Sequence, residues 1–153
     1  MRNISKEEYE IASRYLFVDL TLSTIDVDLK NLHDNVLFKI KEVYINLLEK
    51  LQVIGTKERR NLKKLLKQED IQIVMTTKRD TFTEYTIYCK GNEVVKSYFN
   101  PHIRNRVRDM MNEWLGKIEE SNKSTSLGAL HNLRVTKFIY MISTFFDIFP
   151  IHH

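Results

Sequence analysis

The chain has 153 residues, of which 42% are apolar and 29% charged, a composition that suits one soluble domain with a core. Its 4 glycines and 2 prolines are too few for a many-stranded sandwich or barrel, which needs turn residues at short intervals. The net charge of +4 is concentrated between Gly55 and Arg108, where 13 Lys and Arg stand against 6 Asp and Glu. Such a local excess attracts phosphate backbones, anionic lipid or acidic proteins, although a solvated surface that keeps the protein soluble is the plainer alternative.

Several classes of protein are excluded or disfavoured at this level. Cys89 is the single cysteine, which excludes an internal disulfide and suits a reducing compartment. Met1 leads directly into charged residues without the apolar core of a signal peptide. No stretch reaches the ~20 apolar residues of a transmembrane helix. The sequence therefore predicts a cytoplasmic protein with no transmembrane segment.

The first element is a long helix that begins at a capping box, Ser5 to Glu8. Its apolar residues then recur at alternating spacings of four and three, which is a heptad seam. Two interpretations are open, namely packing on the next helix of the same chain and an intermolecular coiled coil that makes a homodimer or binds a protein partner. The seam consists of Ile11, Tyr15, Val18, Leu22, Ile25, Leu29 and Leu32.

Two further helices are predicted before the first strand. A wide apolar stripe indicates a helix from Val36 to Gln52, and Gly55 is placed to terminate it with a positive φ. Thr56 can cap a third, short helix that reaches Lys67 and carries most of the basic residues. Cations near the N-terminus of a helix oppose its dipole, which suggests that these charges serve another purpose.

The apolar period then changes from that of a helix to that of a strand. Ile71–Thr76, Thr81–Cys89 and Glu93–Phe99 are rich in β-branched and aromatic residues, and Gly91-Asn92 supplies a turn. These segments predict a three-stranded antiparallel meander, which needs a helix against its apolar face.

A long amphipathic helix follows, with Asn100 as its cap and Pro101 at its first position. Residues 1–120 are predicted to form a single domain, and 121–128 are a linker by composition. The apolar tail, 129–153, has three possible explanations: docking on the domain, an exposed segment for a partner or membrane surface, and an aberrant end of the reading frame. The fold class is therefore predicted as α+β: an N-terminal helical hairpin, a short basic helix, the meander and a long C-terminal helix.

No recognisable catalytic or cofactor motif is present, so a non-enzymatic protein without a cofactor is expected. The five histidines are scattered and there is no second thiol, which makes a structural zinc site very unfavourable. The four glycines are isolated, so neither a P-loop nor a dinucleotide fingerprint exists. An acid on the strongest strand, Glu84, lacks the Lys two residues later that metal-dependent nucleases often carry.

The order helix, helix, turn, basic helix and β-hairpin is similar to the arrangement of a winged helix, in which one helix enters the major groove. The similarity is to the arrangement alone, because Asn61 and Lys64 hold the positions where apolar residues would lock a helix-turn-helix. We expect nucleic-acid binding, with a protein-interaction or regulatory module using the seam or the tail as the alternative. The expected nucleic-acid-binding residues are Lys57, Arg59, Arg60, Lys63, Lys64, Lys67, Lys78, Arg79, Arg104 and Arg108.

Overall fold

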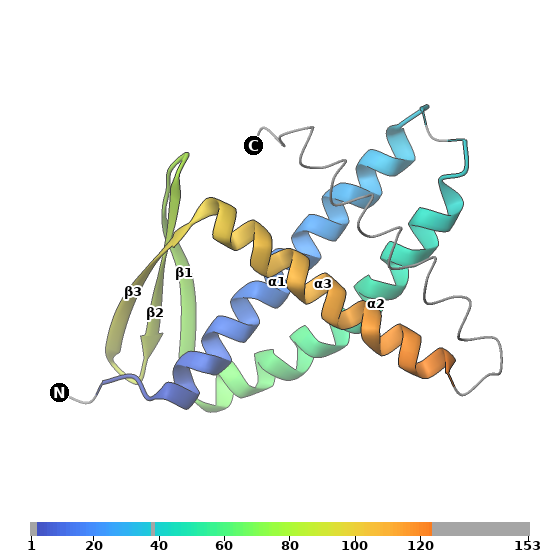
Figure 1. Ribbon diagram of the computed structural model, residues 1–153. Coiled ribbons are helices and arrows are strands. Elements are labelled where there is room, and N and C mark those ends of the chain that lie inside the picture. Colours follow the sequence, from blue (N-terminus) through green and yellow to red (C-terminus); the bar gives the residue numbers. More distant parts are fainter. Residues whose placement is uncertain (1–2, 38, 124–153) are drawn as a thin grey trace. The chain divides into compact units, whose positions relative to one another are not determined.

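The computed structural model describes residues 3–37 and 39–123. They form α1 (Lys6–Asp34), α2 (Glu42–Gln68), β1 (Ile71–Lys78), β2 (Phe82–Cys89), β3 (Asn92–Phe99) and α3 (Asn100–Asn122), as Figure 1 shows. Helices stand at both ends of this described part and an antiparallel sheet lies between them in the sequence. The predicted α+β fold class is therefore confirmed.

α1 begins at the capping box that the sequence predicts. The Ser5 hydroxyl accepts a hydrogen bond from the Glu8 amide at 3.1 Å, and the Glu8 carboxylate accepts one from the Ser5 amide at 2.8 Å. The hydroxyls of Thr21 and Thr24 donate to carbonyl oxygens one turn earlier, at 2.6 and 2.9 Å. These bonds explain how a helix with two threonines in its middle keeps its polar groups satisfied.

The middle of the heptad seam of α1 lies in the core. Val18, Leu22 and Ile25, from the middle of the seam, are at most 3% exposed. α1 contacts α2 and the strands β1 and β2. These three side chains therefore pack inside the chain, whereas the other seam residues, Ile11, Tyr15, Leu29 and Leu32, are half-buried.

α2 is one continuous helix of 27 residues, where the sequence predicts two helices separated at Gly55. Gly55 is buried in the middle of the helix. A glycine in a helix costs roughly 0.5–1 kcal/mol relative to alanine, too little to end a helix that packs on a neighbour along its length. The predicted turn at Gly55 and the separate short basic helix are therefore wrong. The predicted start at Val36 is also wrong, because α2 begins at Glu42.

Side-chain contacts join α1 to α2 along their lengths. They link Arg14 Nε to Glu58 Oε1 (2.5 Å), Arg59 Nη1 to Asp19 Oδ1 (3.1 Å) and Gln52 Nε2 to Asp26 Oδ1 (2.6 Å). Late residues of α2 contact early residues of α1, so the two helices are antiparallel. This is the predicted helical hairpin.

The three strands form the predicted antiparallel meander, in the order β1-β2-β3. The turn between β2 and β3 is one residue earlier than predicted, at Lys90 and Gly91, and Cys89 pairs with Asn92 across it. Both turn residues have positive φ, 49° and 81°, which is the conformation that matches the twist of a two-residue hairpin. Lys90 adopts this conformation without being a glycine, and its side chain makes two ion pairs described below.

The two faces of the sheet differ. One face packs on the helices, where Ile87 and Cys89 join Ala12 of α1 and Leu66 of α2 in a buried cluster. On the other face, Val74, Tyr88 and Val95 are 42–55% exposed. Alternation along each strand produces this difference, because successive side chains point to opposite faces.

The chain divides into two compact units after Met110. α3 begins at Asn100, one residue before the predicted first position, Pro101, and its residues from Met111 onward belong to the second unit. The predicted tail, 129–153, lies outside the described residues, as does the predicted linker except for residues 121–123. Within the described ranges, no helix combines the length and the apolar character needed to cross a membrane.

Candidate nucleic-acid interface

The outward face of α2 carries a row of cations. Lys57, Arg60, Lys64 and Lys67 are spaced by three, four and three residues, which places them on one side of a helix. The buried residues of α2, among them Leu62 and Leu66, lie on the opposite side. At ~1.5 Å per residue the row is about 15 Å long. We call these four residues, together with the neighbouring Lys63, the α2 basic face.

The cations of the α2 basic face project into solvent. All five side chains are exposed, and none of them has a described carboxylate within ion-pair distance. Since no described partner neutralises them, their charges add to one local positive field.

Two residues of α2 change the predicted set. Arg59 is half-buried and its guanidinium lies 3.1 Å from Asp19 on α1, so it helps to hold the helices together. Lys50, which the prediction omitted, is exposed and lies seven residues before Lys57. In one continuous helix, a spacing of seven places both on the same face. The prediction missed this relation because it ended the helix at Gly55.

Two more of the predicted residues, Lys78 and Arg79, lie at the end of β1 that is far from α2. Lys78 ends that strand and Arg79 follows it in the β1–β2 turn, where the Arg79 amide donates to the Phe82 carbonyl at 2.8 Å. The Asn100 side-chain amide donates to the carbonyls of Arg79 (2.8 Å) and Asp80 (2.9 Å). Asn100, predicted as a helix cap, therefore fixes the tip of the hairpin at the start of α3.

α3 contributes the last two predicted residues. Arg104 is exposed one turn after Asn100, near the tip, and Arg108 is half-buried. Arg106 between them packs on the ring of Phe17, with its guanidinium carbon 4.2 Å from the ring centroid. Of these three arginines, Arg104 is exposed and the other two are partly buried.

The predicted site therefore splits into two groups. Lys67 lies just before β1 and Lys78 lies at its end, so the eight residues of that strand separate them, roughly 25 Å at ~3.3 Å per residue. A winged helix would bring the wing tip beside the recognition helix. Here the hairpin tip and the α2 basic face are at opposite ends of the strand, and the winged-helix-like order found in the sequence is not the arrangement in space.

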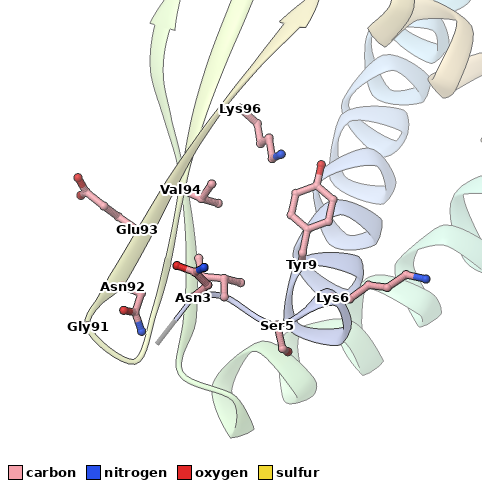
Figure 2. Close-up of a pocket in the computed structure, with 10 residues that line it drawn as sticks. Asn3, Ser5, Lys6, Tyr9, Gly91, Asn92, Glu93, Val94 and Lys96 are labelled. Carbon is pink, nitrogen blue, oxygen red and sulfur yellow. The ribbon is translucent and has the colours of Figure 1, made fainter. Parts of the chain in front are cut away.

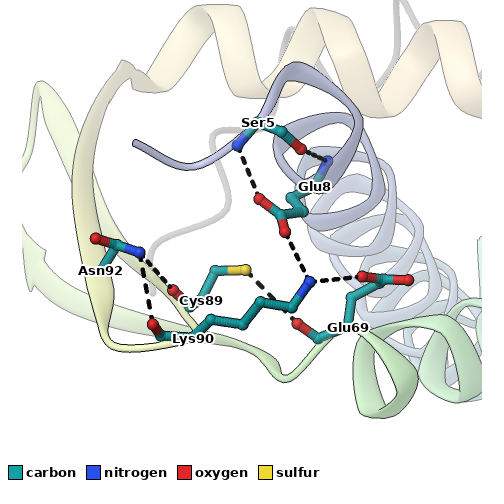
Figure 3. Close-up of polar contacts among 6 residues, drawn as sticks. All are labelled: Ser5, Glu8, Glu69, Cys89, Lys90 and Asn92. Carbon is teal, nitrogen blue, oxygen red and sulfur yellow. Dashed lines mark hydrogen bonds and ion pairs between the residues drawn. The ribbon is translucent and has the colours of Figure 1, made fainter. Parts of the chain in front are cut away.

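Ion pairs at the start of α1 hold three elements together (Figure 3). Lys90 Nζ lies 2.9 Å from Glu8 Oε1 and 2.8 Å from Glu69 Oε2. The Ser5 amide, and after it the Lys90 ammonium, lower the pKa of Glu8 from 4.5 to about 2. Glu69 and Glu8 raise the pKa of Lys90 above its ordinary value. Because the pKa of Glu8 is lowered on folding, its contribution to stability is present above pH 4.5 and is lost as the pH falls through about 2.

A pocket of about 550 Å³ lies between the start of α1 and the β2–β3 hairpin (Figure 2). Tyr9 and Lys96 face each other across it, with the ammonium 4.8 Å from the ring centroid. The Tyr9 hydroxyl is also 3.2 Å from the hydroxyl of Tyr98. None of the predicted nucleic-acid-binding residues lines this pocket.

Asp28 is a polar residue that the sequence did not single out. It is 3% exposed, and its Oδ1 atom has no hydrogen-bond partner among the described residues. Burial raises the pKa of this carboxyl from 3.8 to about 7. A carboxylate of this kind destabilises the fold when it is charged.

Metal-binding side chains do not converge in the part of the chain that the structure describes. No three or more His, Cys, Asp or Glu residues lie close enough together there to hold an ion. The buried thiol of Cys89 donates to the carbonyl of Glu69 at 3.6 Å.

This fold and surface define a small α+β protein with a basic helix face and a separate basic hairpin tip. The chain belongs to the YhjD protein family, which it matches over residues 3–119, from the residues before α1 into the last turns of α3. It is 30% identical over 115 residues to "Uncharacterized protein YhjD" of Bacillus subtilis (strain 168), a match that covers 75% of this chain and 95% of the relative. No solved structure is significantly similar to the chain.

Proposed function

We propose that the protein is a non-enzymatic, nucleic-acid-binding protein and that the α2 basic face makes the main contact. The observation that supports this function best is the row of exposed Lys and Arg without a described carboxylate partner. A helix displays such a row at a regular spacing, and the phosphates of a nucleic-acid strand are also regularly spaced.

The composition of the α2 basic face favours contacts to phosphates. Four of its five residues are lysines and only Arg60 has the bidentate geometry that reads guanine. Lysine contributes mainly a point charge, and contacts to phosphate carry little sequence information. We therefore expect binding that depends strongly on salt and weakly on sequence.

The test is fluorescence anisotropy of a labelled mixed-sequence duplex and of a labelled single strand, titrated with the full chain at about 50 and 200 mM salt. If the five residues each engage a phosphate, the slope of log K against log salt is about −4.5 for the duplex, so affinity falls by roughly 10²–10³ over this range. Flat curves at both salt concentrations would show that the proposal is wrong.

Charge-reversal variants locate the contact on the molecule. Arg60→Glu with Lys64→Glu should abolish binding while leaving the circular dichroism spectrum unchanged, because both side chains are exposed. The matched control is Lys30→Glu with Lys123→Glu, which makes the same change in net charge at exposed positions on α1 and at the end of the described chain. An equal loss in both double variants would indicate that net charge, and not the α2 basic face, governs binding.

A further inference from the structure

Two partly exposed aromatic rings lie beside the turn between β1 and β2, one on β2 and the other on β3. Phe82, at the start of β2, pairs in register with Phe99, at the end of β3. Their ring centroids are 5.5 Å apart with the planes at 52°, and the residues are 45% and 47% exposed. A cross-strand aromatic pair contributes to the stability of a sheet. Both residues keep nearly half of their surface open to solvent, where a ligand could reach the rings.

Cations lie near this aromatic pair in the chain. Arg79 lies in the turn before Phe82, and Arg104 lies one turn into the helix that follows Phe99. Lys78 is at the same tip but pairs with Thr83, so it lies on the opposite face of the sheet from the two rings. All three are exposed. The acidic residues at this end are Asp80, which is exposed, and Glu84, which is half-buried, so the local balance is positive.

The backbone at the tip is fixed before any ligand binds. The Asn100 amide donates to the Thr81 carbonyl at 2.8 Å, and the Asn100 side chain bonds to the carbonyls of Arg79 and Asp80. Its carboxamide oxygen also accepts from the Thr83 hydroxyl at 2.8 Å. A single residue thus ties together β2, the turn and α3. A preorganised surface loses less conformational entropy on binding than a mobile loop.

We propose that this surface, the Phe82–Phe99 tip, binds single-stranded nucleic acid by stacking unpaired bases on the two rings while Arg79 and Arg104 contact the phosphates. Exposed aromatic rings beside cations are the combination that single-strand binding requires, since every base has a face that can stack. A duplex keeps its bases stacked inside and offers none to the rings. The inference rests on the proposed function, to which it adds a second contact that selects single strands.

The experiment compares a 12-nucleotide oligo(dT) strand with a 12-base-pair mixed-sequence duplex, both binding the full chain in fluorescence anisotropy. Phe82→Leu with Phe99→Leu should weaken binding of the single strand by about tenfold or more, because base stacking on an aromatic ring contributes ~1–3 kcal/mol per base. Duplex affinity should not change. Phe82→Tyr with Phe99→Tyr should restore single-strand binding, since a phenol ring stacks as well.

Val95→Ala is the matched control, because Val95 is 55% exposed on the same face of the sheet but cannot stack on a base. It should bind both nucleic acids like the wild type. If the leucine variant binds oligo(dT) as tightly as the wild type, or weakens for strand and duplex alike, the inference is overturned. Loss of binding only in the Arg60→Glu, Lys64→Glu variant would then leave the proposed function standing alone.

A second measurement uses the unmodified protein and does not depend on the folding of a variant. Oligo(dT) carrying 5-iodouracil is irradiated in complex with the wild type, and the crosslinked peptides are identified by mass spectrometry. Crosslinks to Phe82 or Phe99 are expected. Crosslinks confined to residues 57–67 would contradict the inference while supporting the α2 basic face, and a wild type that binds neither nucleic acid would contradict both.

Discussion

The two long helices have nearly the same length, 29 residues for α1 and 27 for α2, and they pack on each other, but they use their surfaces in opposite ways. α1 buries residues on several sides, among them the polar Glu8, Thr21 and Asp28. α2 buries a stripe of leucines and Gly55 and exposes its cations. Most positions of α1 are therefore constrained by packing, whereas the outer positions of α2 that carry the cations are exposed to solvent.

The largest effect expected from this comparison is on stability. Leu22→Ala on α1 removes a side chain that is 3% exposed, and it should lower the free energy of unfolding by about 2–5 kcal/mol. Leu65→Ala on α2 removes one that is 40% exposed and should cost less than about 1 kcal/mol. Urea unfolding followed by circular dichroism measures both.

The same experiment distinguishes a core residue from an interface residue. If Leu22 lay between two chains, the unfolding midpoint would rise with protein concentration, because association stabilises the folded state by mass action. We expect no such dependence. Equal losses for the Leu22 and Leu65 variants would mean that the two helices are not packed as described.

Asp28 gives the next largest effect, and it depends on pH. Since burial raises its pKa from 3.8 to about 7, the folded state holds a proton that the unfolded state releases between these values. Stability from this group is thus fully present below pH 3.8 and is lost as the pH rises to about 7. Asp28→Asn, which stays neutral, should be more stable than the wild type above pH 7, by about 4 kcal/mol at ~1.4 kcal/mol per pKa unit.

Thermal unfolding of both proteins between pH 4 and pH 8 measures this difference. The melting temperatures should coincide near pH 4 and diverge as the pH rises. Asp34→Asn is the control, because it removes an exposed carboxylate from the same helix. If Asp28→Asn destabilises the protein at pH 8, the charged carboxylate has a favourable partner and α1 tolerates its buried charge for that reason.

The sequence predicted most of the fold because most elements carry their own local determinants. The capping box at Ser5 and Glu8 begins α1, and the alternation from Ile71 to Phe99 produces three strands of the predicted order. The prediction failed at Gly55, where it expected a helix to end. The local preference of this glycine for a helix end is weaker than the packing of α2 on α1, and that packing depends on residues far apart in the chain, such as Gln52 and Asp26, which are 26 positions apart.

The candidate site was predicted as a list of residues but not as a surface. The sequence selected these residues by charge density along the chain, and the structure exposes most of them. It could not separate the α2 basic face from the hairpin tip, because a strand carries the chain away between them. Nor could it identify the Phe82–Phe99 pair, which requires the register of two strands.

The smallest expected effect is on duplex binding, and it concerns two adjacent arginines of α2. Arg60 is exposed on the α2 basic face, whereas Arg59 is held by Asp19 of α1. Arg60→Gln should weaken duplex binding severalfold and make the salt slope shallower by about 1, the change expected for one lost phosphate contact. Arg59→Gln should affect binding less and should cost at most ~1 kcal/mol of stability, since ion pairs that are this exposed contribute little.

Asp19→Asn completes this comparison, because it releases Arg59 without changing α2. If α1 determines which cations of α2 are free, this variant should bind the duplex more tightly than the wild type. It should also give a steeper salt dependence, because one more cation can reach a phosphate. If Arg59→Gln instead weakens binding as much as Arg60→Gln does, the contact with Asp19 opens when nucleic acid binds. The division of α2 into a packing side and a binding side would then be a property of the free protein alone.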